Sequence, residues 1–230
     1  LLAGVCGAAL VGLVTGALAI RRQGIYFAMI TLAFAQMIYF FCVQAPFTHG
    51  EDGLQGIPRK ALLGGLIPTK DDRVLYYVVL AIFLFGYFAI YRIIHSPFGQ
   101  VLKAIRDNEQ RAQSLGYEAD RYKLLAFVLS AALAGLAGAT KAMVLQFATL
   151  TDVSAAMSGE VVLMALVGGL GTIVGPVVGA FIIITMQNYL AATGEFVLVI
   201  QGAIFVIIVL AFRKGVVGEF AEWWKRRQTR

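Results

Sequence analysis

Few polar residues in this sequence have the types and spacing that catalysis or metal binding requires. The two cysteines, Cys6 and Cys42, each lie inside an apolar run, so neither a disulfide framework nor a metal site is predicted. His49 stands alone, and Glu51 and Asp52 in the loop after it supply too few oxygen ligands for a calcium site. We therefore expect a chain that is not an enzyme and uses no metal or cofactor.

A glycine cluster later in the chain has the density of a phosphate-binding loop. It contains Gly168, Gly169, Gly171 and Gly175, but no Lys-Ser or Lys-Thr pair follows, so nucleotide binding is not predicted. Small residues recur at every fourth position in two segments, a spacing that lets helices approach closely. These residues are Ala131, Gly135 and Ala139, and then Gly171, Gly175 and Gly179.

The composition explains the shortage of reactive groups. Of the 230 residues, 60% are hydrophobic and only 14% are charged, a balance typical of polytopic membrane proteins. Lipid cannot satisfy backbone hydrogen bonds, and the apolar runs do not alternate with polar residues, so the spans are predicted to be helices. The predicted fold is an all-α polytopic transmembrane helical bundle, with residues 1–230 forming a single transmembrane domain.

Six apolar segments are candidates for these spans: 1–20, 25–46, 74–94, 123–147, 160–191 and 196–212. The fifth segment is broken by GGLGTIVGP and is too short for two upright spans of about 20 residues each. We expect two short or tilted helices there, or a re-entrant hairpin. The first segment has no initiator methionine or basic region before it, so we also expect a fragment that lacks N-terminal spans.

The basic residues predict the orientation of the chain. Placing 21–24, 92–123 and 213–230 on one side of the membrane gathers 14 of the 19 Lys and Arg residues there. By the positive-inside rule this side is cytoplasmic, and the C-terminus lies on it. The net charge of +6 is then a signal of topology, and no nucleic-acid partner is expected.

The polar segment, residues 96–123, separates two of these apolar runs. Ser96 and Pro97 are typical of a helix start, Gly116 of a helix end, and Asp120 of a cap for the next helix. Apolar side chains recur at helical spacing along the predicted helix: Phe98, Val101, Leu102, Ile105, Ala112 and Leu115.

Three interpretations of this amphipathic helix compete. A solvated loop would leave the apolar face in water, at a cost of about 25 cal/mol per Å². A helix lying on the membrane surface needs a strongly basic polar face, whereas residues 99–123 hold five basic and four acidic side chains. Mixed charges around an apolar stripe suit a protein groove, so we favour docking on a protein. Whether the stripe meets that protein or packs on the chain's own helices is open.

Several sequence stretches resemble one transporter family. EQRAQSLG, residues 109–116, resembles the cytoplasmic EAA loop of ABC importer permeases, although only part of the Glu-Ala-Ala triplet is present. Further stretches are similar, in order, to permeases of high-affinity branched-chain amino acid importers: GIYFAMITLAFAQ, HGEDGLQGIP, SPFGQVLKAIRDNEQRAQSLGY, LSAALAGLAGA and VGGLGTIVGPVVGA. The resemblance covers nearly the whole chain.

This resemblance implies a subunit of the bacterial inner membrane. Its partners would be a second permease subunit, two cytoplasmic ATPase subunits, a periplasmic or extracellular substrate-binding protein and membrane lipid. Residues 96–122 would form the loop that couples to the ATPase, through Phe98, Gly99, Ile105, Arg106, Glu109, Ala112 and Gly116. Polar groups in the spans and the glycine segment give candidates for the translocation path: Thr31, Gln36, Gln146, Gly169, Gly171 and Asn188.

Two alternatives stay open at this point. An ion-coupled secondary transporter or channel for a small polar solute needs charged residues inside the membrane. The candidates in this sequence are Lys141 and Glu160, which we expect near the outer ends of their helices, where they form no ion relay. A membrane enzyme or assembly anchor would need a polar cluster at one bilayer face, which we do not find. The substrate stays undefined among branched-chain amino acids, urea, amides and aromatic acids.

Overall fold

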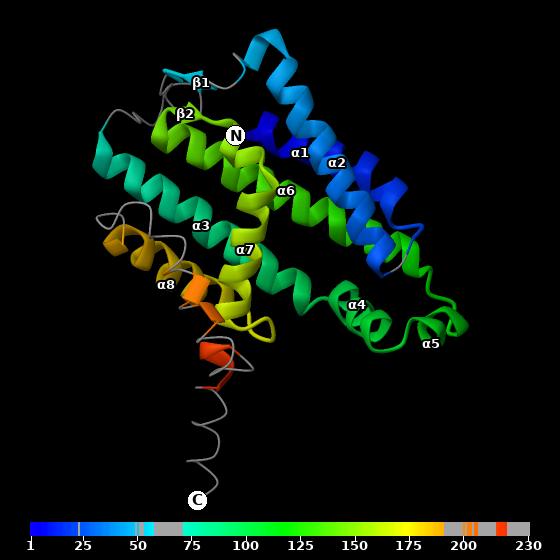
Figure 1. Ribbon diagram of the computed structural model, residues 1–230. Coiled ribbons are helices and arrows are strands. Elements are labelled where there is room, and N and C mark those ends of the chain that lie inside the picture. Colours follow the sequence, from blue (N-terminus) through cyan, green and yellow to red (C-terminus); the bar gives the residue numbers. More distant parts are fainter. Residues whose placement is uncertain are drawn as a thin grey trace, which may run out of the picture. The chain divides into compact units, whose positions relative to one another are not determined.

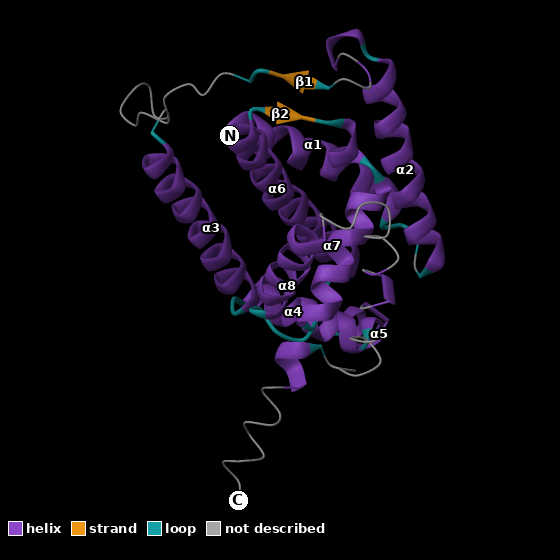
Figure 2. Cartoon of the chain, turned by 60° about the vertical axis from the view of Figure 1, so that its left-hand side comes forward, coloured by secondary structure: helices purple, strands orange, loops and turns teal. Residues whose placement is uncertain are grey.

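The computed structural model describes residues 1–22, 24–48, 50, 53–57, 71–190, 200, 202–203, 205–206 and 215–219. Within these ranges the chain is almost entirely helical (Figures 1 and 2). The long helices are α1 (Leu2–Ala19), α2 (Ile25–Gln44), α3 (Asp72–Ile94) and α6 (Ala119–Leu145). The shorter ones are α4 (Pro97–Asp107), α5 (Glu109–Ser114), α7 (Ala155–Gly168) and α8 (Gly175–Leu190), with 3-10 turns η1 (Pro46–Thr48) and η4 (Leu150–Val153).

Within the described ranges, α1, α2, α3 and α6 are the four helices long and apolar enough to cross a membrane. Large apolar side chains on them are exposed, and no residue of α2 is buried. A helix that is apolar all round is typical of a membrane span. The predicted all-α polytopic fold is confirmed, and these helices begin and end within a few residues of the predicted spans.

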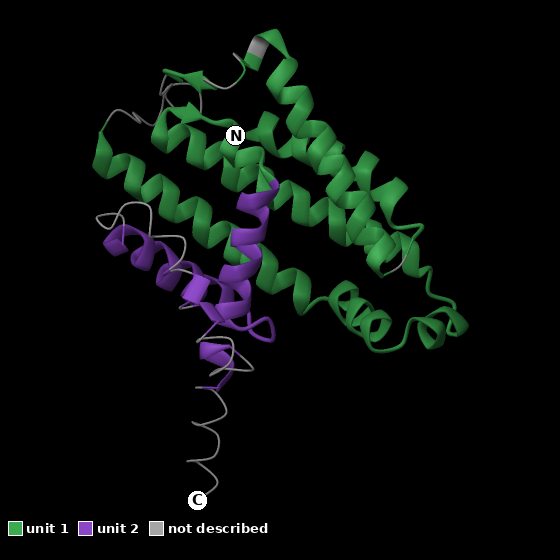
Figure 3. Cartoon of the chain, viewed as in Figure 1, with its two compact units in different colours: residues 1–154 green, residues 155–230 purple. Residues whose placement is uncertain are grey.

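The chain separates into two compact units, residues 1–154 and residues 155–230 (Figure 3). Each unit is described by itself. The first contains α1 to α6 and the second contains α7 and α8. Most of the predicted last span, 196–212, and most of the basic C-terminal region lie outside the described residues. The same is true of His49, Glu51 and Asp52.

Helices α1 and α6 meet along a seam of small residues in the first unit. The two helices are antiparallel, and the residues in contact recur at every fourth position on each helix. The pairs are Gly4 with Ala139, Ala8 with Gly135, Gly12 with Ala131, and Gly16 with Phe127. A Cβ atom on Gly12 would lie 2.5 Å from that of Ala131, and one on Gly4 would lie 2.9 Å from that of Ala139. The prediction that Ala131, Gly135 and Ala139 serve close helix packing is therefore confirmed.

The segment after α2 returns to the end of α6. Strands β1 (Leu54–Gln55) and β2 (Phe147–Ala148) pair antiparallel, and the amide of Ile57 donates to the carbonyl of Gln146 at 2.9 Å. Gln146 caps the C-terminus of α6 in a left-handed conformation. This short ladder lies at one end of α6, and α4 and α5 lie at the other (Figure 1).

The broken apolar segment forms two short helices, α7 and α8, which agrees with either of the two predicted arrangements. Their 14 and 16 residues correspond to about 21 and 24 Å, both shorter than a hydrocarbon core of about 30 Å. A Cβ on Gly179 would overlap backbone atoms of α7, and one on Gly175 would overlap the Gly169 carbonyl oxygen in the turn after α7, so the predicted close packing at these glycines is confirmed. A Cβ on Gly171 would meet no described atom within 4 Å, so this glycine does not serve that contact.

Candidate functional site

The polar segment forms two helices instead of the single helix that we predicted. Helix α4 begins as expected, because the Ser96 hydroxyl accepts a hydrogen bond from the Gly99 amide at 3.3 Å and Pro97 occupies the first turn. It ends at Asp107, where Asn108 is extended and caps α5 by accepting from the Arg111 amide at 3.0 Å. Asn108 is a favoured N-cap residue, so this break carries a sequence signal that we missed.

The second helix ends at the predicted glycine. Gly116 has φ +90°, a conformation that favours glycine, and the Tyr117 amide donates to the Ala112 carbonyl at 3.2 Å. Helix α6 then begins at Ala119, with Glu118 at the N-cap position and without a side-chain cap. The prediction that Asp120 caps this helix is wrong, since Asp120 lies inside the first turn.

Helices α4 and α5, with the turn to Gly116, are here called the α4–α5 element. The apolar face of this element packs on the chain itself. Ile105 is 6% exposed, and Ala112 and Ala119 are each 2% exposed in one cluster. Val101 and Tyr122 pack against this cluster, and the Phe98 ring stacks on the Tyr122 ring with centroids 5.7 Å apart. The open question of where this face points is thereby answered for Ile105 and Ala112, which contact α6 and its entry turn.

Gly99 allows the corner between α3 and α4. It is buried, and a Cβ atom there would overlap the Ile94 carbonyl and lie 2.6 Å from the Ile93 carbonyl oxygen. The Ser96 hydroxyl donates to the same Ile93 oxygen at 2.6 Å. Close approach of two helix ends therefore explains glycine at this position.

The outer surface of the α4–α5 element is exposed and polar, with one large apolar side chain. Leu115 is 71% exposed, so its predicted place on the apolar face is wrong. Its exposed neighbours on the same element are Lys103, Arg106, Asp107, Gln110, Arg111 and Gln113. Arg106 pairs with Asp107 at 3.2 Å, and both side chains are largely exposed. Such a surface offers an apolar anchor surrounded by charges to a protein partner.

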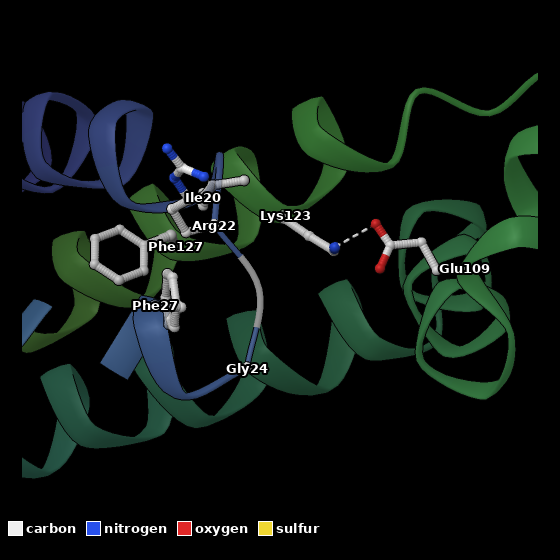
Figure 4. Close-up of a pocket in the computed structure, with 7 residues that line it drawn as sticks. All are labelled: Ile20, Arg22, Gly24, Phe27, Glu109, Lys123 and Phe127. Carbon is white, nitrogen blue, oxygen red and sulfur yellow. Dashed lines mark hydrogen bonds and ion pairs between the residues drawn. The ribbon is translucent and has the colours of Figure 1, made fainter. Parts of the chain in front are cut away.

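An ion pair also joins α5 to α6. Lys123 Nζ lies 2.5 Å from Glu109 Oε1, and their side chains are only 27% and 23% exposed (Figure 4). Both residues line a cavity of about 440 Å³ beside the turn between α1 and α2. The other lining residues are Ile20, Arg22, Gly24, Phe27 and Phe127. Sequence reasoning missed Lys123, because nothing in the sequence pairs it with Glu109 across the intervening turn.

The candidate path residues fall in both units. Thr31 and Gln36 are half-buried on α2, where the Thr31 hydroxyl donates to the Phe27 carbonyl at 3.0 Å. Gln146 is exposed at the end of α6. In the second unit Gly169 is buried, whereas Gly171 and Asn188 are exposed. The structure gathers no three of these six residues into one described pocket.

The two charges expected near helix ends have partners. Lys141 Nζ lies 2.5 Å from Asp152 Oδ1 near the end of α6, in agreement with the prediction. Glu160 accepts a hydrogen bond from Gln187 of α8. Because α7 begins at residue 155 and not at 160, Glu160 lies inside the helix, and its predicted place at a helix end is wrong.

Similar proteins are transport permeases. High-affinity branched-chain amino acid transport system permease protein LivM of Escherichia coli (strain K12) is 28% identical over 225 residues, which cover 88% of this chain and 53% of that protein. Ribose import permease protein RbsC of Bacillus subtilis (strain 168) is 32% identical over 173 residues, 70% of this chain and 50% of that protein.

A third similar protein is the probable branched-chain amino acid transport permease protein LivH of Methanocaldococcus jannaschii. It is 31% identical over 145 residues, 59% of this chain and 43% of that protein. The chain spans about half the length of the curated relatives it matches first. No solved structure matches it.

The family match extends over both units. The family described as "Branched-chain amino acid transport system / permease component" matches residues 1–209, which include every helix from α1 to α8. The order of the spans, the α4–α5 element between α3 and α6, and the glycine-rich α7–α8 hairpin thus all fall inside the match. This multi-pass membrane chain belongs to the branched-chain amino acid permease family.

Proposed function

We propose that this chain is the membrane-spanning subunit of an ABC importer that moves branched-chain or related amino acids across the bacterial inner membrane. Residues 1–230 form one permease domain in this proposal, with the C-terminus in the cytoplasm. A second permease subunit completes the path, two ATPase subunits hydrolyse ATP, and an extracytoplasmic binding protein delivers the substrate. The chain itself catalyses no reaction.

The observation that carries the proposal is the construction of the α4–α5 element. It lies between two helices long enough to span a membrane, and its apolar face is buried against the second of them. Among the described residues, Leu115 and several charged side chains of the same element are exposed. An element of this kind can receive a force from a partner and pass it into the membrane helices.

The geometry divides the proposed coupling residues into two groups. Phe98, Gly99, Ile105, Ala112 and Gly116 shape and support the α4–α5 element from within. Arg106 belongs to the second group and is exposed, and we add its exposed neighbours Gln110, Arg111 and Leu115 as further groups that meet the ATPase. Glu109 belongs to neither group by exposure alone, because its side chain is partly buried in an ion pair with Lys123 of α6.

We place the translocation path among the polar and glycine residues of the spans. Thr31, Gln36, Gln146, Gly169, Gly171 and Asn188 are the candidates, and a zwitterionic amino acid needs such hydrogen-bonding groups when it leaves water. Similarity to proteins named for branched-chain amino acid transport supports the substrate class. Another similar protein is named for ribose import, so similarity by itself leaves the individual substrate open.

Copurification and reconstitution test the proposal together. The full-length protein is expressed with its neighbouring transporter subunits, purified through a tag on this chain, and reconstituted in proteoliposomes with radiolabelled leucine. We expect an ATPase to copurify, and we expect uptake to stop when its catalytic residue is replaced. Uptake that continues with the inactive ATPase would favour an ion-coupled carrier and overturn the proposal.

Gly116→Pro tests the coupling assignment within the same assay. Proline cannot adopt φ +90° and removes the amide that donates to the Gln113 carbonyl at 2.9 Å. We expect membrane insertion to persist and ATP-dependent uptake to be lost. Uptake at the wild-type rate would show that the turn after α5 has no part in coupling.

A further inference from the structure

We propose that Lys123 is a positioning residue that fastens α5 to the spanning helix α6 through Glu109. The structural part of this proposal stands on geometry alone, whereas its consequence for transport rests on the proposed function. In that function the Glu109–Lys123 ion pair is a joint through which a movement of the α4–α5 element reaches α6.

Helix α5 needs such an attachment because it cannot be stable by itself. It has six residues, far fewer than the 12–15 at which an isolated helix becomes even marginal in water. Its only buried residue is Ala112, whose methyl group contributes little apolar area. A second contact with α6 therefore adds to what holds the orientation of α5 about its own axis.

The ion pair supplies a second contact between α5 and α6, one turn before Ala112. Glu109 and Lys123 both line the cavity of about 440 Å³, together with described residues of the α1–α2 turn (Figure 4). Ala112 and Glu109 are three residues apart and lie one helical turn from each other along α5. One attaches through the apolar cluster and the other through the charge, which restricts both rotation and tilt of the helix.

Partial burial makes this pair different from the other ion pairs of the same segment. Arg121 and Glu118 are also 2.5 Å apart, but they lie three residues apart and their side chains are 78% and 61% exposed. Surface pairs of that kind contribute little, because water and salt screen them. The side chains of Glu109 and Lys123 are each about a quarter exposed. The two residues are 14 positions apart in the sequence, and their ion pair joins two different helices.

The joint continues into the membrane part of the first unit. Lys123 lies in the second turn of α6, and Phe127 one turn later contacts Phe27 of α2 edge to face at 6.3 Å. From Phe127 onward α6 is in close contact with α1 along the small-residue seam. A displacement of α6 at Lys123 is thus carried to α1 and α2 by direct packing.

The test compares Lys123→Gln, Glu109→Gln and the charge swap Glu109→Lys with Lys123→Glu in the full-length complex. Amide hydrogen exchange of residues 109–114 reports the attachment without any reference to transport. We expect exchange in this segment to be about tenfold faster in each single variant, since a charge-assisted bond is lost. The swap should restore protection to within about threefold of wild type.

The functional arm measures substrate imported per ATP hydrolysed in proteoliposomes. We expect this ratio to fall about three- to tenfold in each single variant and to recover in the swap and in Lys123→Arg. Arg121→Gln is the matched control, because it removes an ion pair of equal length that joins α6 only to its own N-cap residue. It should change neither the exchange of residues 109–114 nor the import ratio.

The outcomes separate this inference from the proposed function. Unchanged exchange in Lys123→Gln, or exchange as fast in Arg121→Gln as in Lys123→Gln, overturns the joint. Faster exchange in the single variants that the swap fails to reverse overturns the pairing with Glu109. If the wild-type complex shows no ATP-dependent uptake, the proposed function fails. The Glu109–Lys123 attachment is still supported in that case if hydrogen exchange is faster in both single variants and recovers in the charge swap.

Discussion

Two helix contacts of the first unit, the α1/α6 seam and the α4–α5 element, are built from opposite kinds of residue. The seam brings glycine and alanine together, so that a Cβ on Gly4 or Gly12 would lie within 2.9 Å of an alanine methyl group. The α4–α5 element instead uses an isoleucine, stacked aromatic rings and an ion pair. The difference reflects the solvent that each contact must compete with.

In lipid, burying an apolar side chain gains little, because the surrounding acyl chains are equally apolar. Close approach of two backbones through small residues gives the dispersion contacts that hold such helices together. In water, removal of apolar surface is itself stabilising, and charges at the rim select the geometry. The residue types of the two contacts thus agree with a membrane location for the seam and an aqueous location for the α4–α5 element.

The largest expected effect is that of a large side chain in the seam. A Cβ on Gly135 would overlap Ala8 and lie 2.7 Å from the Gly4 carbonyl oxygen, so Gly135→Leu must separate the two helices. We expect a loss of about 3 kcal/mol in unfolding free energy, measured by thermal unfolding in detergent. Gly138→Leu is the control, because a Cβ there would meet no described atom within 4 Å. Equal stability of the two variants would contradict the seam.

A smaller loss is expected from overpacking the apolar cluster. Ala112 is 2% exposed, so Ala112→Leu places three additional carbons where no room exists. We expect a loss of about 2 kcal/mol, measured by the same unfolding assay, together with reduced uptake. Gln113→Leu, at the exposed neighbouring position, should keep the stability of the wild type. If both variants unfold at the wild-type temperature, Ala112 is not a packing residue.

Leu115 should affect function without affecting stability. Its side chain is 71% exposed, so Leu115→Asp removes an apolar anchor from the outer surface and leaves the cluster intact. We expect binding of the ATPase to weaken about tenfold, which corresponds to about 1.4 kcal/mol. Affinity is measured with purified subunits in nanodiscs, and thermal unfolding serves as the control. Binding as tight as in wild type would place the docking surface elsewhere on the chain.

The smallest effect is that of the helix cap. Ser96→Ala removes a hydroxyl that accepts from the Gly99 amide and donates to the Ile93 carbonyl at the α3–α4 corner. We expect a loss of about 1 kcal/mol in unfolding free energy. Ser114→Ala is the matched control, since its hydroxyl donates only within its own helix, to the Arg111 carbonyl at 2.8 Å. A larger loss in the control than in Ser96→Ala would exclude the capping role.

The spans and the start of α4 were predictable because they depend on local properties. Hydropathy adds up along the chain, and a serine followed by proline favours a helix start wherever it occurs. The break at Asn108 was missed because the apolar spacing from Ile105 to Ala112 suggests a continuous helix. The exposure of Leu115 was missed because helical spacing was extended through it, whereas α5 ends at Ser114 and Leu115 is its C-cap residue.

The sequence by itself determined that the chain is a helical membrane protein with a polar segment between two spans. Composition and the spacing of apolar residues can be read without knowing which helices pack against each other. Only the tertiary structure decided that Ile105 and Ala112 face α6, that Glu109 pairs with Lys123, and that the small residues of α6 meet those of α1. Each of these contacts depends on the turn between two helices and on their relative rotation. A one-dimensional pattern shows that a face is apolar, whereas its partner is chosen by the three-dimensional path of the chain.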